Sequence, residues 1–176
     1  MNGHPGGIAH TRHLLDLASL PAGARILDLG AGAGEAVLLM RELGYDASGL
    51  DISPRAEFVQ QGDLLQTDLP DASFDAVLSQ CSFFVSGNVQ QALQEAHRLL
   101  KPGGKLLLSD IFFSPAEALM QNAGLTVLCK EDLTAQWREY YLDALWHDDV
   151  PCRISFPRGK CNYLLLIGRK DDHGSV

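Results

Sequence analysis

The feature that most limits how this chain can fold is an apolar run that ends in closely spaced glycines. Residues 24–29 are almost wholly apolar, which is typical of a strand buried on both faces of a parallel sheet. Gly30, Gly32 and Gly34 follow at once, and residues 35–43 then repeat apolar side chains at helical spacing. Because glycines carry no side chain, such a loop lets a ligand approach the backbone closely. The segment therefore predicts a strand, a ligand-binding loop and a helix, in that order.

Strands and helices alternate along most of the chain. The expected strands are residues 24–29, 47–52, 57–61, 74–79, 105–110, 125–129 and 162–168. The expected helices are residues 11–20, with Thr11 as the cap, then 35–43, 88–100, 115–122 and 135–146. Such alternation predicts an α/β fold, a three-layer sandwich around a doubly wound, mostly parallel sheet, here of seven strands. Ligands bind such sheets beyond the carboxyl ends of the strands.

Charged residues near the glycines indicate which ligand the loop holds. A nicotinamide dinucleotide favours a third glycine at position 35, but Glu35 stands there and would repel a pyrophosphate beside the helix N-terminus. S-adenosylmethionine has no phosphate and carries an ammonium group, for which Asp28 is a suitable neighbour. Asp51 ends the second strand, where a carboxylate can accept hydrogen bonds from ribose hydroxyls. These residues favour S-adenosylmethionine over a dinucleotide.

Residues after Asp51 are candidates for an adenine site. Ile52 offers an apolar surface to the base. Asp63 follows the third strand and can accept a hydrogen bond from the adenine amino group, while the backbone amide of Leu64 donates one to the ring. The alternative for Asp63 is an ordinary turn residue.

Taken together, these segments resemble the class I S-adenosylmethionine-dependent methyltransferases along nearly the whole chain. Four segments carry the likeness: Ile26-Leu27-Asp28-Leu29-Gly30-Ala31-Gly32-Ala33-Gly34, Gly49-Leu50-Asp51-Ile52-Ser53, Gly62-Asp63 with Ser73-Phe74-Asp75-Ala76-Val77, and Arg98-Leu99-Leu100-Lys101-Pro102-Gly103-Gly104-Lys105. The resemblance implies these cofactor contacts: Asp28, Gly30, Gly32 and Gln80 at the methionine end, Asp51 at the ribose, and Asp63 and Leu64 at the adenine. It also implies that residues 161–169 form an antiparallel strand inserted between the fifth and sixth strands.

The chain departs from that family between its second and third strands. Only Pro54, Arg55 and Ala56 separate Ser53 from the expected third strand, where the family usually has a full helix. A parallel crossover normally takes a dozen or more residues, so we expect the helix to be missing and this edge of the sheet to be short or irregular. The adenine end of the pocket is then expected to be more open.

Length and composition limit the function further. The 176 residues fit one domain, residues 1–170, followed by a flexible tail, residues 171–176. A net charge of −8 disfavours nucleic acid as a partner, since such binding needs clustered Lys and Arg. The chain shows no signal segment and no run that could span a bilayer, and its four cysteines lack metal-binding spacing. We therefore expect a cytoplasmic protein without a membrane span or a metal site.

The expected reaction is methyl transfer from S-adenosylmethionine to a small-molecule acceptor, which leaves S-adenosylhomocysteine. The sequence does not identify a general base. Asp110 and His10 are candidates, although a structural role is favoured for each, and Cys81 permits a soft acceptor such as a thiol. Two alternatives stay open: a non-catalytic S-adenosylmethionine-binding protein, and a transferase that moves another group from the same cofactor. The sequence does not indicate the oligomeric state.

Overall fold

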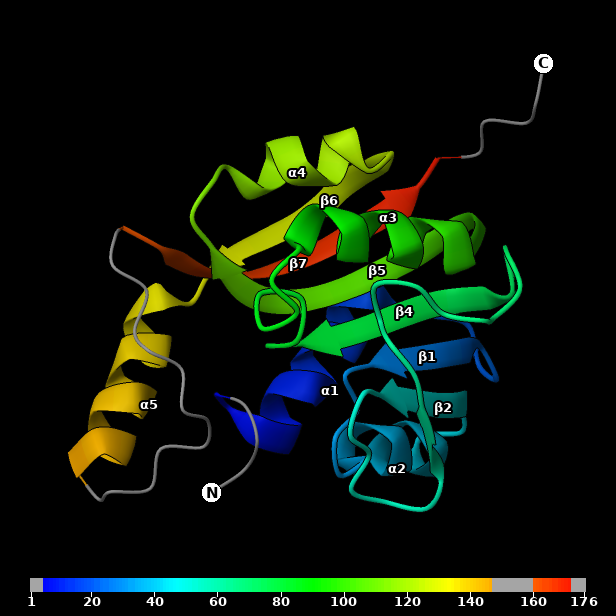
Figure 1. Ribbon diagram of the computed structural model, residues 1–176, viewed down its shortest axis with the longest axis horizontal. Coiled ribbons are helices and arrows are strands. Elements are labelled where there is room, and N and C mark those ends of the chain that lie inside the picture. The colour runs from blue at the N-terminus through cyan, green and yellow to red at the C-terminus, as the bar shows by residue number, and fades with distance from the viewer. Residues whose placement is uncertain (1–4, 147–159, 172–176) are drawn as a thin grey trace.

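A seven-stranded sheet forms the middle layer of the fold, with the strand order β3-β2-β1-β4-β5-β7-β6 (Figure 1). The strands are β1 (Arg25–Leu29), β2 (Asp46–Asp51), β3 (Val59–Gln61), β4 (Phe74–Gln80), β5 (Leu100–Phe112), β6 (Leu125–Asp132) and β7 (Asn162–Lys170). The helices are α1 (Gly7–Ala18), α2 (Glu35–Glu42), α3 (Val89–Leu99), α4 (Ala116–Asn122) and α5 (Thr134–Trp146). This computed structural model describes residues 5–146 and 160–171, so residues 172–176 of the expected tail lie outside it. The predicted α/β fold with seven strands is confirmed.

Helices cover both faces of the sheet with a large apolar core on each, and a third, smaller cluster of described residues lies under α5 with Trp137, Tyr141 and Tyr163. Leu14 of α1 and Met40 of α2 belong to one core, and Leu93 of α3 and Met120 of α4 belong to the other. Successive side chains of a strand point to opposite faces, so each central strand supplies apolar residues to both cores. This explains why the central strands are nearly continuous apolar runs. Of the helices in the described residues, none is long and apolar enough to cross a membrane.

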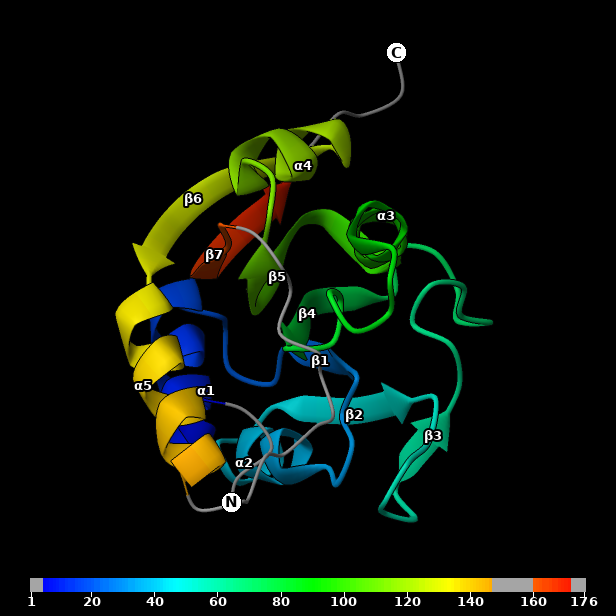
Figure 2. The ribbon, with the colours of Figure 1, turned by 60° about the vertical axis from the view of Figure 1, so that its left-hand side comes forward.

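The C-terminal strand β7 lies between β5 and β6 and runs antiparallel to both (Figure 2). Its pairing with β5 extends from Phe112↔Asn162 to Lys105↔Arg169. The inserted antiparallel strand expected over residues 161–169 is therefore confirmed.

The connection from β2 to β3 contains no helix, as the short sequence predicted. β3 has three residues and pairs in parallel with the end of β2, at the edge of the sheet opposite β6 (Figure 2). The connection instead packs on the glycine loop: the Arg55 amide donates to the Gly32 carbonyl at 2.9 Å. The Phe58 ring lies where a Cβ on Gly34 would stand, and the Arg41 guanidinium lies 5.4 Å from its centroid. These contacts cover the loop in place of a helix.

The first helix begins earlier than the sequence predicted. Thr11 was expected to cap it, but α1 starts at Gly7, after Gly6 in a left-handed conformation. Thr11 is fully buried inside the helix, where its hydroxyl donates to Oε1 of Gln80 at 2.9 Å. The cap prediction was wrong because a tertiary partner on β4, rather than the helix end, satisfies this hydroxyl.

The third helix ends where β5 begins, and the pairing of β5 with β4 is irregular there. Asn88 caps α3 by accepting a hydrogen bond from the Gln91 amide at 3.1 Å. β5 begins at Leu100, earlier than expected, and its register with β4 shifts between Phe74↔Leu100 and Ala76↔Lys105. Residues 101–104 thus form an irregularity within β5.

Candidate functional site

A cleft of about 340 Å³ opens beyond the carboxyl ends of β1, β2, β3 and β4. It is lined by Gly30, Asp51, Ile52, Asp63, Leu64, Leu65, Cys81, Ser82, Val85 and Ser86. The four segments that follow these strands therefore meet at one edge of the sheet, where α/β folds bind their ligands. A volume of this size suits a small molecule.

The glycine loop forms one wall of this cleft and has no space for side chains. Gly30 has a φ of +86°, and a Cβ on it would lie 2.0 Å from Oγ of Ser82. Its amide and that of Ala31 both donate to the carbonyl of Leu50, at 2.8 and 3.1 Å. The loop is thus fixed to β2 by its backbone, and glycine is required for its close approach to the segment after β4.

Asp51 links the end of β2 to the glycine loop. One carboxylate oxygen accepts a hydrogen bond from the Gly32 amide at 2.8 Å, and the other accepts one from the Ser53 amide at 2.8 Å. Each oxygen can accept a second bond, and Asp51 lines the cleft. The carboxylate can therefore serve a ligand hydroxyl while it orders the loop.

Asp28 lies in β1, two residues before Gly30, and is 5% exposed. Burial, reinforced by the nearby charge of Asp51, raises the pKa of the Asp28 carboxyl to about 7. A buried carboxyl of this kind gains from a cationic partner, because a positive charge favours its ionised form. Asp28 is not among the residues that line the cleft.

The wall on the far side of Asp51 is formed by residues 63–65, with Ile52 at its rim. Asp63 is exposed, and its carboxylate accepts a hydrogen bond from the Leu65 amide at 2.8 Å in a tight turn. Ile52 is 70% exposed and Leu64 is half-buried. All three line the cleft, so the structure brings them together with Gly30 and Asp51.

Gln80, at the end of β4, stands apart from this group. Its side-chain oxygen accepts the hydrogen bond from the hydroxyl of Thr11, so it faces α1. The residue that reaches the cleft from this strand end is its neighbour Cys81. Gln80 and Gly32, like Asp28, are next to the cleft in the chain but do not line it.

The three candidate catalytic residues occupy different settings. Asp110 is 1% exposed, and its oxygens accept the amides of Phe83, Phe84 and Ile111 at 2.8, 3.1 and 2.7 Å. Burial raises its pKa to about 6, although those three hydrogen bonds oppose the rise. Its carboxylate therefore orders the backbone of the connection between β4 and α3.

Cys81 lines the cleft, whereas His10 does not. Cys81 has a φ of +58°, and its sulfur lies 3.3 Å from the hydroxyl of Tyr163, which in turn donates to Ser109 at 3.2 Å. His10 lies on α1, with its ring centroid 6.4 Å from that of Tyr163. Among the described residues, no group of three His, Cys, Asp or Glu side chains could hold a metal ion.

Four lining residues were not predicted: Leu65, Ser82, Val85 and Ser86. Ser82, Val85 and Ser86 belong to the connection after β4, which has no sequence motif of its own. The one available signal was Cys81 with its neighbour Ser82, directly after a predicted strand end. Their place in the cleft follows from the hydrogen bonds that Asp110 makes to this connection.

Comparisons with known proteins agree with this fold. Residues 27–108 match the family model described as a methyltransferase domain. The demethylmenaquinone methyltransferase of Tropheryma whipplei (strain Twist) is 34% identical over 106 residues, which cover 53% of this chain and 44% of that protein. The arsenite methyltransferase of Aquipseudomonas alcaligenes is 31% identical over 115 residues, which cover 51% of this chain and 33% of that one. The chain thus spans less than half the length of these relatives.

Solved structures share the fold at low sequence identity. The phosphoethanolamine N-methyltransferase 2 of Haemonchus contortus, solved with S-adenosylhomocysteine, superposes with a TM-score of 0.74 at 18% identity, over 96% of this chain and 54% of that one. The cyclase SpnF superposes with a TM-score of 0.71 at 19% identity, over 93% and 80%. The fold is therefore the Rossmann-like fold of class I enzymes. Residues 27–108, just under half of this chain, thus match a methyltransferase domain, and the fold is the one seen in solved S-adenosylmethionine-dependent methyltransferases.

Proposed function

We propose that this protein transfers a methyl group from S-adenosylmethionine to a small-molecule acceptor. The observation that carries the proposal is the bridge by which Asp51 ties the glycine loop to the end of β2 at the edge of the cleft. This arrangement offers a carboxylate to the ribose next to a loop that admits a ligand to its backbone. The sequence relatives that bear methyltransferase names support the same reaction.

The residues present suit this cofactor better than a dinucleotide. Among the described residues that line the cleft are two carboxylates, Asp51 and Asp63, but no Lys or Arg that could neutralise a pyrophosphate. Asp28 adds a buried carboxyl beside the loop, where an ammonium group would favour its ionised form. We assign Asp28, Gly30, Gly32 and Gln80 to the methionine end, Asp51 to the ribose, and Ile52, Asp63 and Leu64 to the adenine.

The protein's own contribution to the reaction is alignment and the exclusion of water. When bound, S-adenosylmethionine supplies a methyl group that is already activated on a sulfonium. Cys81, Ser82 and Val85 form the cleft wall opposite the glycine loop, and the acceptor would lie along it. Orientation of this kind supplies up to roughly 7–11 kcal/mol of rate enhancement. We assign no general base, because the carboxylate of Asp110 is engaged by three backbone amides.

Three further features support a small acceptor, a cytoplasmic location and a single domain. The net charge of −8 argues for a small acceptor rather than nucleic acid. No disulfide joins any of the three described cysteines, Cys81, Cys129 and Cys161, which is usual in the cytoplasm. One sheet with helices on both faces extends from α1 to β7, which supports a single domain over residues 1–170.

The test has two stages, the first for the cofactor and the second for the reaction. S-adenosylhomocysteine at 100 times its dissociation constant should stabilise the protein by about 2.7 kcal/mol, whereas NAD should not. A screen of small acceptors with S-adenosylmethionine labelled on its methyl group should then yield a labelled product. Binding without any labelled product would favour a non-catalytic S-adenosylmethionine-binding protein. Transfer of a different group would favour a transferase that moves another group from the same cofactor. A shift with NAD alone would refute the proposal.

A further inference from the structure

We propose that the polar face of α3, formed by Gln91, Glu95 and Arg98, positions the adenine-side wall of the cleft and thereby sets the selectivity for the base. That wall is the segment of residues 62–73, of which residues 63–65 line the cleft. This inference rests on the proposed function, because the wall selects a base only if an adenine nucleoside lies against it. Gln91, Glu95 and Arg98 are then positioning residues rather than residues that contact the cofactor.

The wall has little support from regular structure. Residues 62–73 contain neither helix nor strand, and the strand before them, β3, is only three residues long. The Gly62 amide donates to the carbonyl of Asp51 at 2.9 Å, which anchors the start of the segment. Beyond that point the backbone of the wall must be held by something other than the sheet.

Side chains of α3 hold the wall at every second residue. Nε2 of Gln91 donates to the carbonyl of Leu65 at 3.1 Å. A carboxylate oxygen of Glu95 accepts both the amide and the hydroxyl of Thr67, at 2.8 and 2.7 Å. Nη1 of Arg98 donates to the carbonyl of Leu69 at 2.8 Å. Residues 91, 95 and 98 share one face of the helix, so one rigid element holds three alternate residues of the wall.

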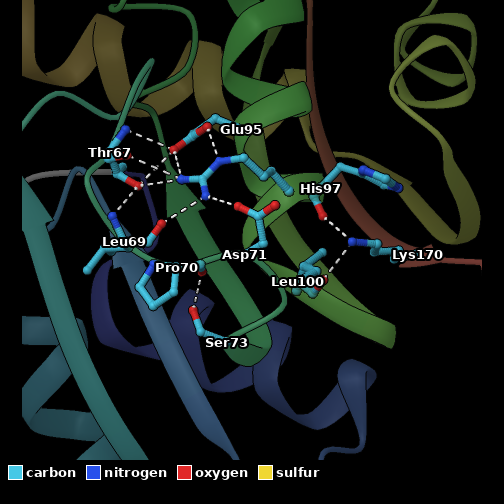
Figure 3. Close-up of polar contacts among 10 residues, drawn as sticks. Thr67, Leu69, Pro70, Asp71, Ser73, Glu95, His97, Leu100 and Lys170 are labelled. Carbon is cyan, nitrogen blue, oxygen red and sulfur yellow. Dashed lines mark hydrogen bonds and ion pairs between the residues drawn. The ribbon is translucent and has the colours of Figure 1, made fainter.

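Arg98 is the centre of this arrangement. Its Nε and Nη2 donate to the two carboxylate oxygens of Glu95 at 2.9 and 2.6 Å, and Nη2 also donates to the hydroxyl of Thr67 at 3.1 Å. It pairs in addition with the carboxylate of Asp71 (Figure 3). The planar guanidinium thus uses its fork of donors to join helix and wall, which a lysine could not do.

The side chains of Thr67 and Glu95 are largely withdrawn from water. Thr67 and Glu95 are each 8% exposed. Burial would raise the pKa of Glu95, but the hydrogen bonds from Arg98 and Thr67 hold it below its usual value. The side chain of Arg98 is 31% exposed, but its loss would leave the buried carboxylate of Glu95 without its cationic partner, so the wall should shift when Arg98 is lost.

The experiment compares two ligands that differ only at the base. S-adenosylhomocysteine and S-inosylhomocysteine, which carries hypoxanthine and lacks the exocyclic amino group, are titrated into the wild type, Arg98→Ala and the milder Thr67→Val. We expect the wild type to prefer the adenine compound. In Arg98→Ala the affinity for that compound should fall about tenfold, with a smaller loss for the hypoxanthine compound. The KM for S-adenosylmethionine should rise while kcat stays within about twofold.

Lys170→Met is the matched control. Lys170 donates to the carbonyls of His97 and Leu100 at 2.9 and 2.8 Å, so it also holds the end of α3 (Figure 3). Both of these hydrogen bonds go to backbone outside residues 62–73, and Lys170 senses the wall through the charge of Asp71, so its loss should lower stability with little change in the preference between the two ligands. If this control lost the preference as Arg98→Ala does, the effect would belong to α3 in general and the inference would be wrong.

The remaining outcomes separate this inference from the proposed function. Failure of the wild type to bind S-adenosylhomocysteine would overturn both. Normal binding with equal affinity for the two ligands, or an unchanged preference in Arg98→Ala, would overturn only the role of the α3 face. If Arg98→Ala does not fold, Thr67→Val decides the question, and an unchanged preference there would overturn the inference.

Discussion

Two of the three walls of the cleft, the glycine loop and the connection after β4, are held in different ways. The glycine loop is fixed to β2 by its own amides and by Asp51, which lies 19 residues from Gly32 at the end of the neighbouring parallel strand. The wall after β4 is held by side chains from distant positions: Asp110, 27 residues from Phe83, and Tyr163, 82 residues from Cys81. The first wall can therefore be recognised from a short motif, whereas the second depends on the completed sheet.

The largest effect is expected from Gly30→Ala, which tests whether the two walls must touch. A methyl group there would meet Oγ of Ser82 at 2.0 Å, so the affinity for S-adenosylhomocysteine should fall about 100-fold, or roughly 2.7 kcal/mol. Gly23→Ala is the control, because Gly23 has a similar φ of +72° with no atom within 4 Å of its Cβ position. Calorimetric titration of both variants measures the difference. Equal losses would mean that backbone strain, not the contact between walls, explains the result.

Asp51→Ala should break the link within the glycine-loop wall. The Gly32 amide loses its acceptor and the ribose loses its partner, so cofactor binding should weaken by about 1.5–3 kcal/mol. Asp63→Ala is the comparison, since this exposed carboxylate orders only its own turn and should cost less. Titration with S-adenosylhomocysteine ranks the two. The assignment of Asp51 would fail if both variants bound like the wild type.

Asp110→Asn should disturb the other wall. The side-chain nitrogen of Asn donates and cannot accept, so at least one of the three backbone amides loses its partner and the free energy of unfolding should fall by about 1–3 kcal/mol. Because the change acts on the connection after β4, kcat/KM for the acceptor should fall more than the affinity for S-adenosylhomocysteine. Denaturant unfolding and single-substrate kinetics measure the two effects. A larger loss of cofactor affinity would show that the walls are not independent.

Asp28→Asn tests the charge beneath the glycine loop. The carboxyl has a pKa of about 7 in the folded protein and 3.8 as its ordinary value, so between these pH values the folded state holds a proton that the unfolded state has lost. Its contribution to stability is therefore greatest at low pH and declines as the pH rises towards 7. Asn lacks this titration, so the ligand-free variant should be more stable than the wild type at pH 8, by roughly 1–3 kcal/mol.

The same variant should bind S-adenosylhomocysteine more weakly, since the ammonium group loses its carboxylate. A variant that is more stable but binds the ligand more weakly indicates that the charge of Asp28 serves ligand binding. Asp16→Asn, on the exposed face of α1, is the control and should change neither quantity. Thermal unfolding from pH 4 to 8 measures the slope. If the variant kept the wild-type dependence of stability on pH, Asp28 would not be the source of that dependence.

The smallest effect is expected from Cys81→Ser. The serine hydroxyl can replace the sulfur beside the hydroxyl of Tyr163, so stability should change by less than about 1 kcal/mol. Methyl transfer should stay within a few-fold of the wild type if the acceptor only packs against this wall. Complete loss of turnover with normal S-adenosylhomocysteine binding would instead make Cys81 a catalytic residue.

The comparison also explains which parts of the site could be predicted. Gly30, Asp51, Ile52, Asp63 and Leu64 were read from residues near strand ends, and all five line the cleft. Gln80 was also at a strand end, but it faces Thr11 on α1. The position of a residue in a strand predicts only the face of the sheet on which its side chain lies. Its contact on that face depends on which helix packs there.

The sequence by itself determined the order of elements, the glycine loop and the missing helix after β2, because local spacing and apolar pattern specify them, whereas the insertion of β7 was predicted from the family resemblance. Only the tertiary structure decided that Thr11 lies inside α1, that Asp110 orders the connection after β4, and that the polar face of α3 holds the adenine-side wall. Each of these depends on a hydrogen bond between residues far apart in the chain. Such a bond depends on the packing of helices on the sheet, which spacing along the chain does not encode.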